Sequence, residues 1–197
     1  MRYMTIEREY GSGGTKIARL LSKESQVPCY GEEILKRASE LMNIPVEQIR
    51  ECEEKATNSL LYSIYMLSQV QTGNREMLAK EGKVFVEEQK AILEFAEKGS
   101  AIFVGHCASA ALKEYDDVIS VFIYADKEAK RERIRTDYGI AENKIDSVER
   151  KNNKRRANYY SVNTQKKWSD LRNYDIVLNS SKLGIDECVN TLKNFIY

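Results

Sequence analysis

The sequence is poor in the residues that structural metal centres, disulfide frameworks and membrane spans need. Its 197 residues include one His, four Cys and two Pro. One His cannot complete a Cys/His zinc set, and four widely spaced Cys with no C-x-x-C pair indicate reduced thiols, which are typical of a cytoplasmic protein. No apolar run reaches the roughly 18 residues of a membrane-spanning helix. The first eight residues also lack the apolar stretch of a secretory signal.

The sequence also lacks an excess of charge of either sign. Lys and Arg number 31 and Asp and Glu 30, which gives a formal net charge of +1. This balance gives no general attraction to a nucleic acid polymer or an anionic membrane, so neither is expected as a partner. Charged residues at 31% and apolar residues at 42% are typical of a soluble globular protein. The length predicts a single domain over residues 1–197.

Strand-like and helix-like patterns alternate along the chain. The first 25 residues read as a strand, a glycine-rich turn and a helix, and residues 31–99 are helical almost throughout. The predicted strands are residues 3–8, 101–105, 118–124 and 174–179. The other predicted helices are residues 32–42, 45–54, 58–69, 74–98, 107–113, 127–160 and 184–195. Strands that alternate with helices predict an α/β fold with a central parallel sheet.

The glycine-rich turn is a candidate phosphate site. Glycines let the backbone approach an anion, and the N-terminus of the following helix favours negative charge. The predicted nucleotide-binding residues are Gly11, Ser12, Gly13, Gly14 and Thr15. The alternative is a tight strand–helix turn that binds no ligand.

The turn departs from the standard P-loop, G-x-x-x-x-G-K-[ST]. When Gly13 is set on the second glycine, Gly14 stands at the lysine and Thr15 at the magnesium-ligand position. We therefore predict that Arg8, at the end of the first strand, supplies the missing charge. A dinucleotide fold is disfavoured because Lys16 occupies the place of the third glycine of G-x-G-x-x-G.

Charge is unevenly distributed along the chain. Residues 127–156 hold eleven Lys or Arg against six Asp or Glu, a net +5, whereas residues 31–99 net −4. Arginines that follow the third strand of a phosphate-binding α/β protein can stabilise a transferred phosphoryl group. Arg131 and Arg135 lie one helical turn apart and suit that role. A solvated helix face with i,i+4 ion pairs is the alternative.

Several ordered stretches give the chain a resemblance to the cytidylate kinase-like family. Each stretch is weak alone, and their order and spacing together are specific. The matching stretches are R-E-Y-G-S-G-G at residues 8–14, P-C-Y-G with E-I-L at 28–35, A-I-F-V-G-H-C-A at 101–108, K-x-R-A-x-Y-Y at 154–160, W-S-D at 168–170 and Y-D-I-V-L-N-S at 174–180.

The resemblance implies a three-layer P-loop kinase fold, in which helices cover both faces of a five-stranded parallel sheet. Residues 31–99 would form an acceptor-side helical insertion and residues 127–160 a lid. The implied reaction transfers the γ-phosphoryl group of ATP to CMP or dCMP, with Mg²⁺ near Thr15. The implied catalytic residues are Arg8, Arg131, Arg135, Lys154 and Arg156, and His106 and Asp170 would contact the acceptor.

Three departures from the family pattern bear on the identity of the phosphate acceptor. Gly31 stands where an Asp is usual, His106 where an Arg is usual, and Asn153 where an acid is frequent. A catalytically weak nucleotide sensor and a small-metabolite kinase are therefore the alternatives. Asp170 and Trp168 also have structural readings, as a turn cap and as a packing residue. The apolar segment 58–69 could pack internally or form a homodimer.

Overall fold

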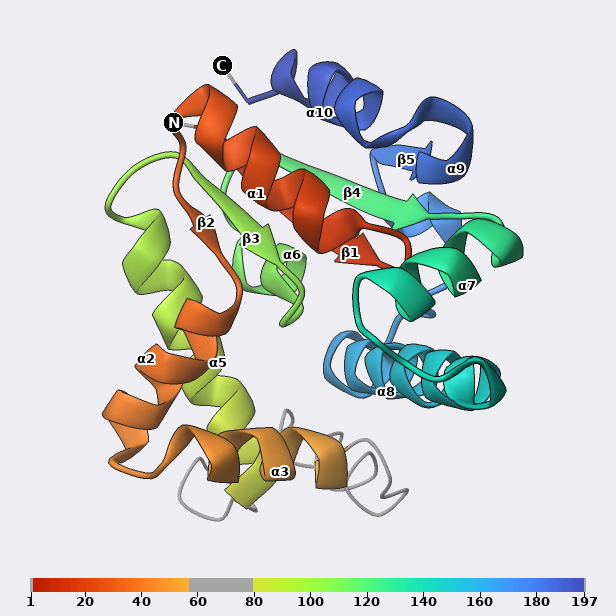
Figure 1. The fold of residues 1–197 in the computed structure, drawn as a ribbon. Coiled ribbons are helices and arrows are strands. Elements are labelled where there is room, and N and C mark those ends of the chain that lie inside the picture. Colours follow the sequence, from red (N-terminus) through yellow and green to blue (C-terminus); the bar gives the residue numbers. More distant parts are fainter. Residues whose placement is uncertain (1, 57–79, 197) are drawn as a thin grey trace.

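A computed structural model describes residues 2–56 and 80–196, and these residues form a five-stranded parallel sheet (Figure 1). The strands are β1 (Tyr3–Arg8), β2 (Cys29–Tyr30), β3 (Ala101–Val104), β4 (Val118–Tyr124) and β5 (Ile176–Asn179). Their order across the sheet is β2-β3-β1-β4-β5. β1 is the central strand, and it pairs in parallel with β3 on one side and β4 on the other.

Helices connect the strands as parallel crossovers require. They are α1 (Gly14–Ser25), α2 (Glu32–Met42), α3 (Val46–Ala56), α5 (Lys80–Ala96), α6 (Ala108–Ala111), α7 (Lys127–Thr136), α8 (Ile145–Thr164), α9 (Ser180–Leu183) and α10 (Ile185–Lys193), with 3₁₀ turns η2 (Glu142–Lys144) and η3 (Leu171–Asn173). No helix in the described part of the chain is long and apolar enough to cross a membrane.

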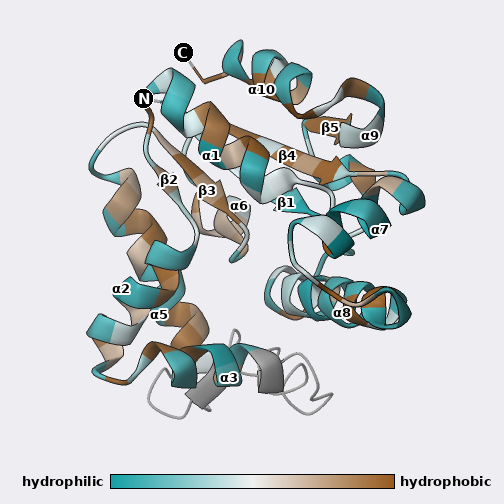
Figure 2. Ribbon diagram, viewed as in Figure 1, coloured by the Kyte–Doolittle hydropathy of each residue, from teal (hydrophilic) through white to brown (hydrophobic). Residues whose placement is uncertain are grey.

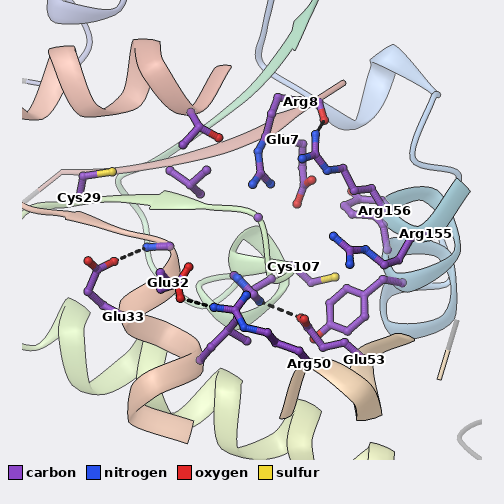
Figure 3. Close-up of a pocket in the computed structure, with 18 of the residues that line it drawn as sticks. Glu7, Arg8, Cys29, Glu32, Glu33, Arg50, Glu53, Cys107, Arg155 and Arg156 are labelled. Atoms are coloured by element: carbon purple, nitrogen blue, oxygen red, sulfur yellow. Dashed lines mark hydrogen bonds and ion pairs between the residues drawn. The ribbon is translucent and has the colours of Figure 1, made fainter. Parts of the chain in front are cut away.

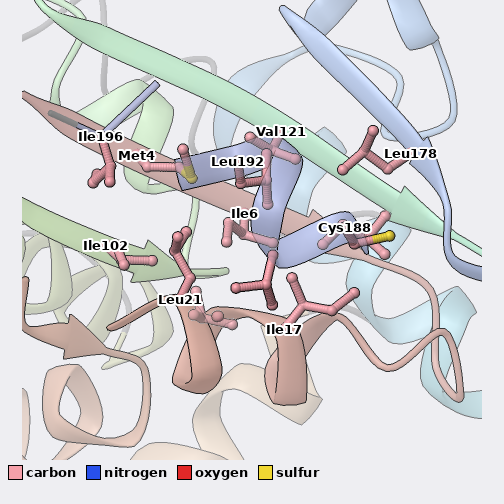
Figure 4. Close-up of a cluster of buried hydrophobic side chains, with 14 residues drawn as sticks. Met4, Ile6, Ile17, Leu21, Ile102, Val121, Leu178, Cys188, Leu192 and Ile196 are labelled. Atoms are coloured by element: carbon pink, nitrogen blue, oxygen red, sulfur yellow. The ribbon is translucent and has the colours of Figure 1, made fainter. Parts of the chain in front are cut away.

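Alternating side chains of the strands pack on opposite faces of the sheet. Met4 and Ile6 of β1 belong to a buried cluster with α1 and α10 (Figure 4), whereas Tyr3 packs with α5 and α6 on the other face. The same alternation separates Ile102 from Phe103 on β3. Figure 2 shows β3 and β4 largely in brown, whereas α7 is mostly teal. Helices therefore cover both faces of the sheet, as the resemblance implied.

Most of the predicted elements are confirmed. Residues 3–8, 118–124 and 32–42 form β1, β4 and α2 with the predicted bounds. The helical segment 127–160 is interrupted, because residues 137–144 form a loop and η2 between α7 and α8. The strand pattern alone missed β2, which has two residues and no alternation to detect. The predicted helix at 58–69 lies outside the described residues.

Candidate active site

The glycine turn connects β1 to α1 and is held from the side of α7. Gly11 has a φ of +80°, and a Cβ there would lie 2.9 Å from Ile134 Cγ1, so a close approach requires glycine. The Ser180 hydroxyl donates to the Ser12 carbonyl at 2.6 Å, and Arg133 Nη1 donates to that hydroxyl at 3.0 Å. The turn is thus fixed through its carbonyl groups.

The N-terminus of α1 offers donors to an anion. Its N-cap is Gly13, which has no side chain to accept from the first-turn N–H groups. Such uncapped amides and the helix dipole favour a negatively charged group. Thr15, in the same turn, lines the neighbouring cavity. The local geometry therefore fits the predicted phosphate site.

The α8 segment also contacts this turn. Asn153 Oδ1 accepts from the Tyr10 backbone N–H at 2.7 Å, and Arg156 Nη1 donates to the Arg8 carbonyl at 2.8 Å. The Arg156 guanidinium lies over the Tyr10 ring at 5.6 Å from its centroid. Beside α8, Lys130 of α7 pairs with Glu9 at 2.9 Å and with Glu149 at 2.7 Å. Both helices of the basic segment are thereby bound to the strand–turn–helix unit.

Arg8 is the last residue of β1, and its guanidinium lies against the end of β3. A Cβ added at Gly105 would approach Arg8 Nη1 to 2.6 Å, so glycine leaves the room that the guanidinium occupies. Arg8 Nε is buried and has no hydrogen-bond partner among the described residues. Burial lowers the pKa of Arg8, and it also lowers that of Arg156, where the Arg8 charge adds to the effect. An anion beside these two side chains would relieve both costs.

A cavity of about 450 Å³ lies at the carboxyl ends of β1 and β3. In parallel α/β sheets this edge is where ligands bind. Figure 3 shows Arg155 and Arg156 reaching it from α8, opposite Glu32 and Glu33. The charged side chains that line it are Arg8, Arg19, Arg50, Arg155, Arg156, Glu7, Glu32, Glu33, Glu53 and His106. The cavity is therefore polar, with an arginine-rich wall beside the glycine turn.

The turn after β3 places His106 in the cavity wall. Gly105, His106 and Cys107 follow one another with φ values of +79°, +56° and +54°. For the two non-glycine residues this backbone conformation costs about 1–3 kcal/mol each, and such strain is found mostly at functional sites. Gln89 Nε2 donates to the His106 carbonyl at 3.0 Å and supports the turn.

The His106 side chain meets two carboxylates of the insertion. Its Nδ1 lies 3.2 Å from Glu53 Oε1 of α3 and 3.6 Å from Glu88 Oε2 of α5. Burial opposes a charge on His106, but the two carboxylates outweigh it and raise its pKa to about 10. Burial and the Glu53 charge raise the pKa of Glu88 to about 7. The Tyr159 hydroxyl of α8 donates to Glu88.

The structure brings only part of the predicted site together. Arg8, Thr15, His106 and Arg156 line the cavity, and Gly11–Gly14 form the adjoining turn. Lys154 is exposed on α8. Arg131 pairs with Glu142 and Asp146, and Arg135 with Glu132. The roles assigned to these three side chains in catalysis stay predictions.

Contacts support a structural role for Asp170 and for Trp168. Asp170 Oδ1 accepts from the Arg172 backbone N–H at 3.2 Å and so caps η3, and its carboxylate also pairs with Arg172. Trp168 is buried, donates from Nε1 to Glu7 at 3.1 Å and packs edge-on against Phe122. Neither lines the cavity. An acceptor contact from Asp170 stays a prediction.

Sequence reasoning missed several cavity residues. Arg19 stands four residues after Thr15, so helical spacing alone places both on one face of α1. Arg50 and Glu53 are likewise three residues apart on α3. Arg155 was counted in the basic segment but not singled out from its neighbours. Glu88 carried no local signal, because only the packing of α5 brings it to His106.

The sheet order, the glycine turn and the arginine-lined cavity define a kinase-like P-loop protein. A shikimate kinase from Bacteroides thetaiotaomicron shares the fold at a TM-score of 0.55 and 14% identity, over 98% of this chain and 97% of that one. An uncharacterized protein from Eubacterium ventriosum ATCC 27560 gives a TM-score of 0.73 and 25% identity, over 100% and 98%.

Sequence comparison gives the family. A cytidylate kinase from Pyrobaculum calidifontis is 28% identical over 153 residues, which are 68% of this chain and 80% of that protein. The model of the cytidylate kinase-like family matches residues 3–182. The chain belongs to the cytidylate kinase-like family, and the family indicates a phosphotransferase.

Proposed function

We propose that the protein transfers the γ-phosphoryl group of ATP to a nucleoside monophosphate, CMP or dCMP. The observation that carries the proposal is the cavity beside the glycine turn, with Arg8 and Arg156 in its wall. Within residues 2–56 and 80–196 neither of these arginines forms an ion pair with a carboxylate. Unpaired guanidinium groups in a partly closed site favour a phosphate ligand.

The chain's own residues fit a nucleotide with its magnesium ion. The uncapped start of α1 and the orphaned Nε of Arg8 offer donors for phosphate oxygens, and the Thr15 hydroxyl is the group that would hold the metal. When bound, Mg²⁺ neutralises charge on the phosphates. In this proposal Arg8 takes the place of the P-loop lysine. Arg156 holds Arg8 by donating to the Arg8 backbone carbonyl.

The acceptor occupies the cavity in this proposal, with its phosphate toward Arg8, Arg155 and Arg156. The base end then lies near the insertion, which supplies Arg50 and Glu53. Lid residues Arg131, Arg135 and Lys154 would approach the donor phosphates if α7 and α8 close further. Four free cysteines, three of them buried, agree with the reducing cytoplasm that we propose as its location.

The test is a single-turnover assay with the full chain, γ-labelled ATP, Mg²⁺ and one acceptor at a time. We expect labelled CDP or dCDP from CMP or dCMP, and less product from UMP or AMP. Thermal-shift measurements with the same ligands run in parallel, because a ligand at 100 times its Kd stabilises by about 2.7 kcal/mol.

The two alternatives give different results. Stabilisation by ATP without transfer to any nucleoside monophosphate would overturn the kinase assignment in favour of a nucleotide sensor. Labelled product with a phosphorylatable metabolite, and none with any nucleoside monophosphate, would replace the acceptor and keep the phosphotransferase.

A further inference from the structure

One cluster of potential ligand atoms lies beside the proposed acceptor site and takes no part in moving the phosphoryl group. Glu53, Glu88 and His106 come from α3, α5 and the turn after β3, and each offers one atom within 4.8 Å of the other two. Glu53 and His106 line the cavity, whereas the Glu88 side chain is completely buried. The cluster therefore lies in the wall of the cavity and is open to it on one side.

Two atoms of the cluster are buried without a hydrogen-bond partner. They are His106 Nδ1 and Glu88 Oε1. A buried polar atom left without a partner costs about 1–3 kcal/mol, and more when the group is charged. Although Nδ1 is close to both carboxylates, its geometry with them does not satisfy a hydrogen bond. Each buried polar atom that is left without a partner in a folded protein calls for an explanation, and a bound ion is one.

The distances in the cluster match the edges of a metal coordination sphere. In a tetrahedral site with metal–ligand bonds of about 2.0–2.1 Å, adjacent ligand atoms lie about 3.3–3.4 Å apart. The two distances from His106 Nδ1 to the carboxylates, 3.2 and 3.6 Å, lie on either side of that value.

The charges also suit a divalent cation. A metal ion that binds His106 displaces its proton, and the neutral imidazole with the two carboxylates then carries a charge of −2, with Glu88 fully buried. Uncompensated buried carboxylates are costly. A divalent ion neutralises both of them, whereas a proton on His106 neutralises only one.

A neighbouring side chain orients one of the ligands. The Tyr159 hydroxyl donates to Glu88 Oε2, the oxygen that lies 3.6 Å from His106 Nδ1, and Oε1 of the same carboxylate has no partner. Hydrogen bonds of this kind fix the ligands of metal sites in other proteins.

We propose that Glu53, Glu88 and His106 bind a divalent transition-metal ion. One nitrogen and two carboxylate ligands are a donor set for Zn²⁺, Mn²⁺ or Fe²⁺, whereas Mg²⁺ prefers oxygen ligands alone. This ion is separate from the magnesium that accompanies ATP. Because two of its ligands line the cavity, the ion would be accessible from the cavity.

The test uses the full chain without a histidine tag, so that His106 is the one imidazole in the sample. After treatment with EDTA and removal of the chelator, Zn²⁺ is titrated by calorimetry and Co²⁺ by its visible absorption. We expect one ion per chain and a Co²⁺ spectrum without the charge-transfer bands of a thiolate, because the neighbouring Cys107 is not a ligand. Binding is read without phosphoryl transfer, so its failure and the failure of the proposed function are distinguishable.

Substitutions separate this site from weak surface binding. His106→Asn and Glu53→Gln should weaken Zn²⁺ binding at least about 100-fold. Glu51→Gln is the matched control, since Glu51 is exposed on the same helix as Glu53. Circular dichroism and thermal unfolding of the metal-free variants show that each is folded.

Nitrogen NMR of His106 gives a readout that needs no variant. A metal-bound neutral imidazole and a protonated imidazolium have different nitrogen shifts, and the spectrum holds one His. We expect Zn²⁺ to convert the signal to the metal-bound form. An imidazolium that persists at saturating Zn²⁺, an undetectable Zn²⁺ affinity, or equal affinity of the parent and His106→Asn would each overturn the proposal.

Discussion

Two groups of arginines in this protein share a charge and differ in their surroundings. Arg8, Arg155 and Arg156 line the cavity, and we call them the cavity arginines. Arg131 and Arg135 on α7 are the surface arginines. The surface arginines lie in solvent-accessible ion pairs with Glu142, Asp146 and Glu132. The cavity arginines form no ion pair with a carboxylate anywhere in residues 2–56 and 80–196.

The cavity arginines and the surface arginines differ in how favourably they would bind a further anion. The guanidinium of an exposed ion pair is already paired and solvated, and the pair is screened and contributes little to stability. A further anion would therefore gain little there. Burial lowers the pKa of Arg8 and Arg156, which shows that the protein alone does not stabilise these charges fully. A phosphate beside Arg8 and Arg156 would supply a negative charge to stabilise both guanidinium groups. Net charge along the sequence cannot distinguish Arg155 and Arg156 from the surface arginines, because all four lie in the same basic segment, residues 127–156.

Replacement of Arg8 should have the largest effect on phosphoryl transfer. We expect Arg8→Ala to lower kcat/KM by about 100-fold or more, since loss of one donor to developing charge has that magnitude. Arg8→Lys should recover part of the loss, because it restores charge without the planar fork of donors. The measurement is steady-state transfer to CMP or dCMP. An Arg8→Ala protein as active as the parent would remove Arg8 from the site.

The next largest effect should come from the glycine that gives the Arg8 guanidinium its room. Gly105→Ala places a Cβ 2.6 Å from Arg8 Nη1 at a φ of +79°. We expect a loss of stability of about 1–3 kcal/mol and a loss of transfer activity of about tenfold, because the guanidinium must move. Urea unfolding and the transfer assay measure the two effects separately.

Gly139→Ala is the matched control for that substitution. Gly139 also has a positive φ, +65°, but a Cβ there would meet nothing within 4 Å. It should lose about 1 kcal/mol from the left-handed conformation and keep its activity. If both variants lose activity equally, backbone strain and not the position of Arg8 is the cause.

The comparison of the two groups also shows how much of the site can be predicted from the sequence. β1, the glycine turn, α1 and Arg8 are adjacent in the chain, so local periodicity and motif spacing predict them together. His106 was implied as an acceptor contact by the family resemblance, and it lines the cavity. The resemblance gave the sheet with five strands, although β2 has too few residues to show a pattern.

Side chains brought in by distant helices were the ones that sequence reasoning missed. Glu88 precedes His106 by 18 residues and reaches it only because α5 packs against one face of the sheet. Arg50 depends in the same way on the position of α3. Nor does the sequence separate Arg131 from Arg156, since the difference lies in which carboxylates each one meets in the fold.

Replacement of a surface arginine should have the smallest effect. We expect Arg131→Ala to change transfer by less than about threefold, because contact with a phosphate requires release of Glu142 and Asp146, whose ion pairs already satisfy it. The same assay as for Arg8 measures this. A loss as large as that of Arg8→Ala would mean that the lid moves, that Arg131 exchanges its carboxylates for the transferred group, and that the two groups of arginines act together. In that case Asp146→Asn, which frees Arg131 in part, should raise the affinity for ATP.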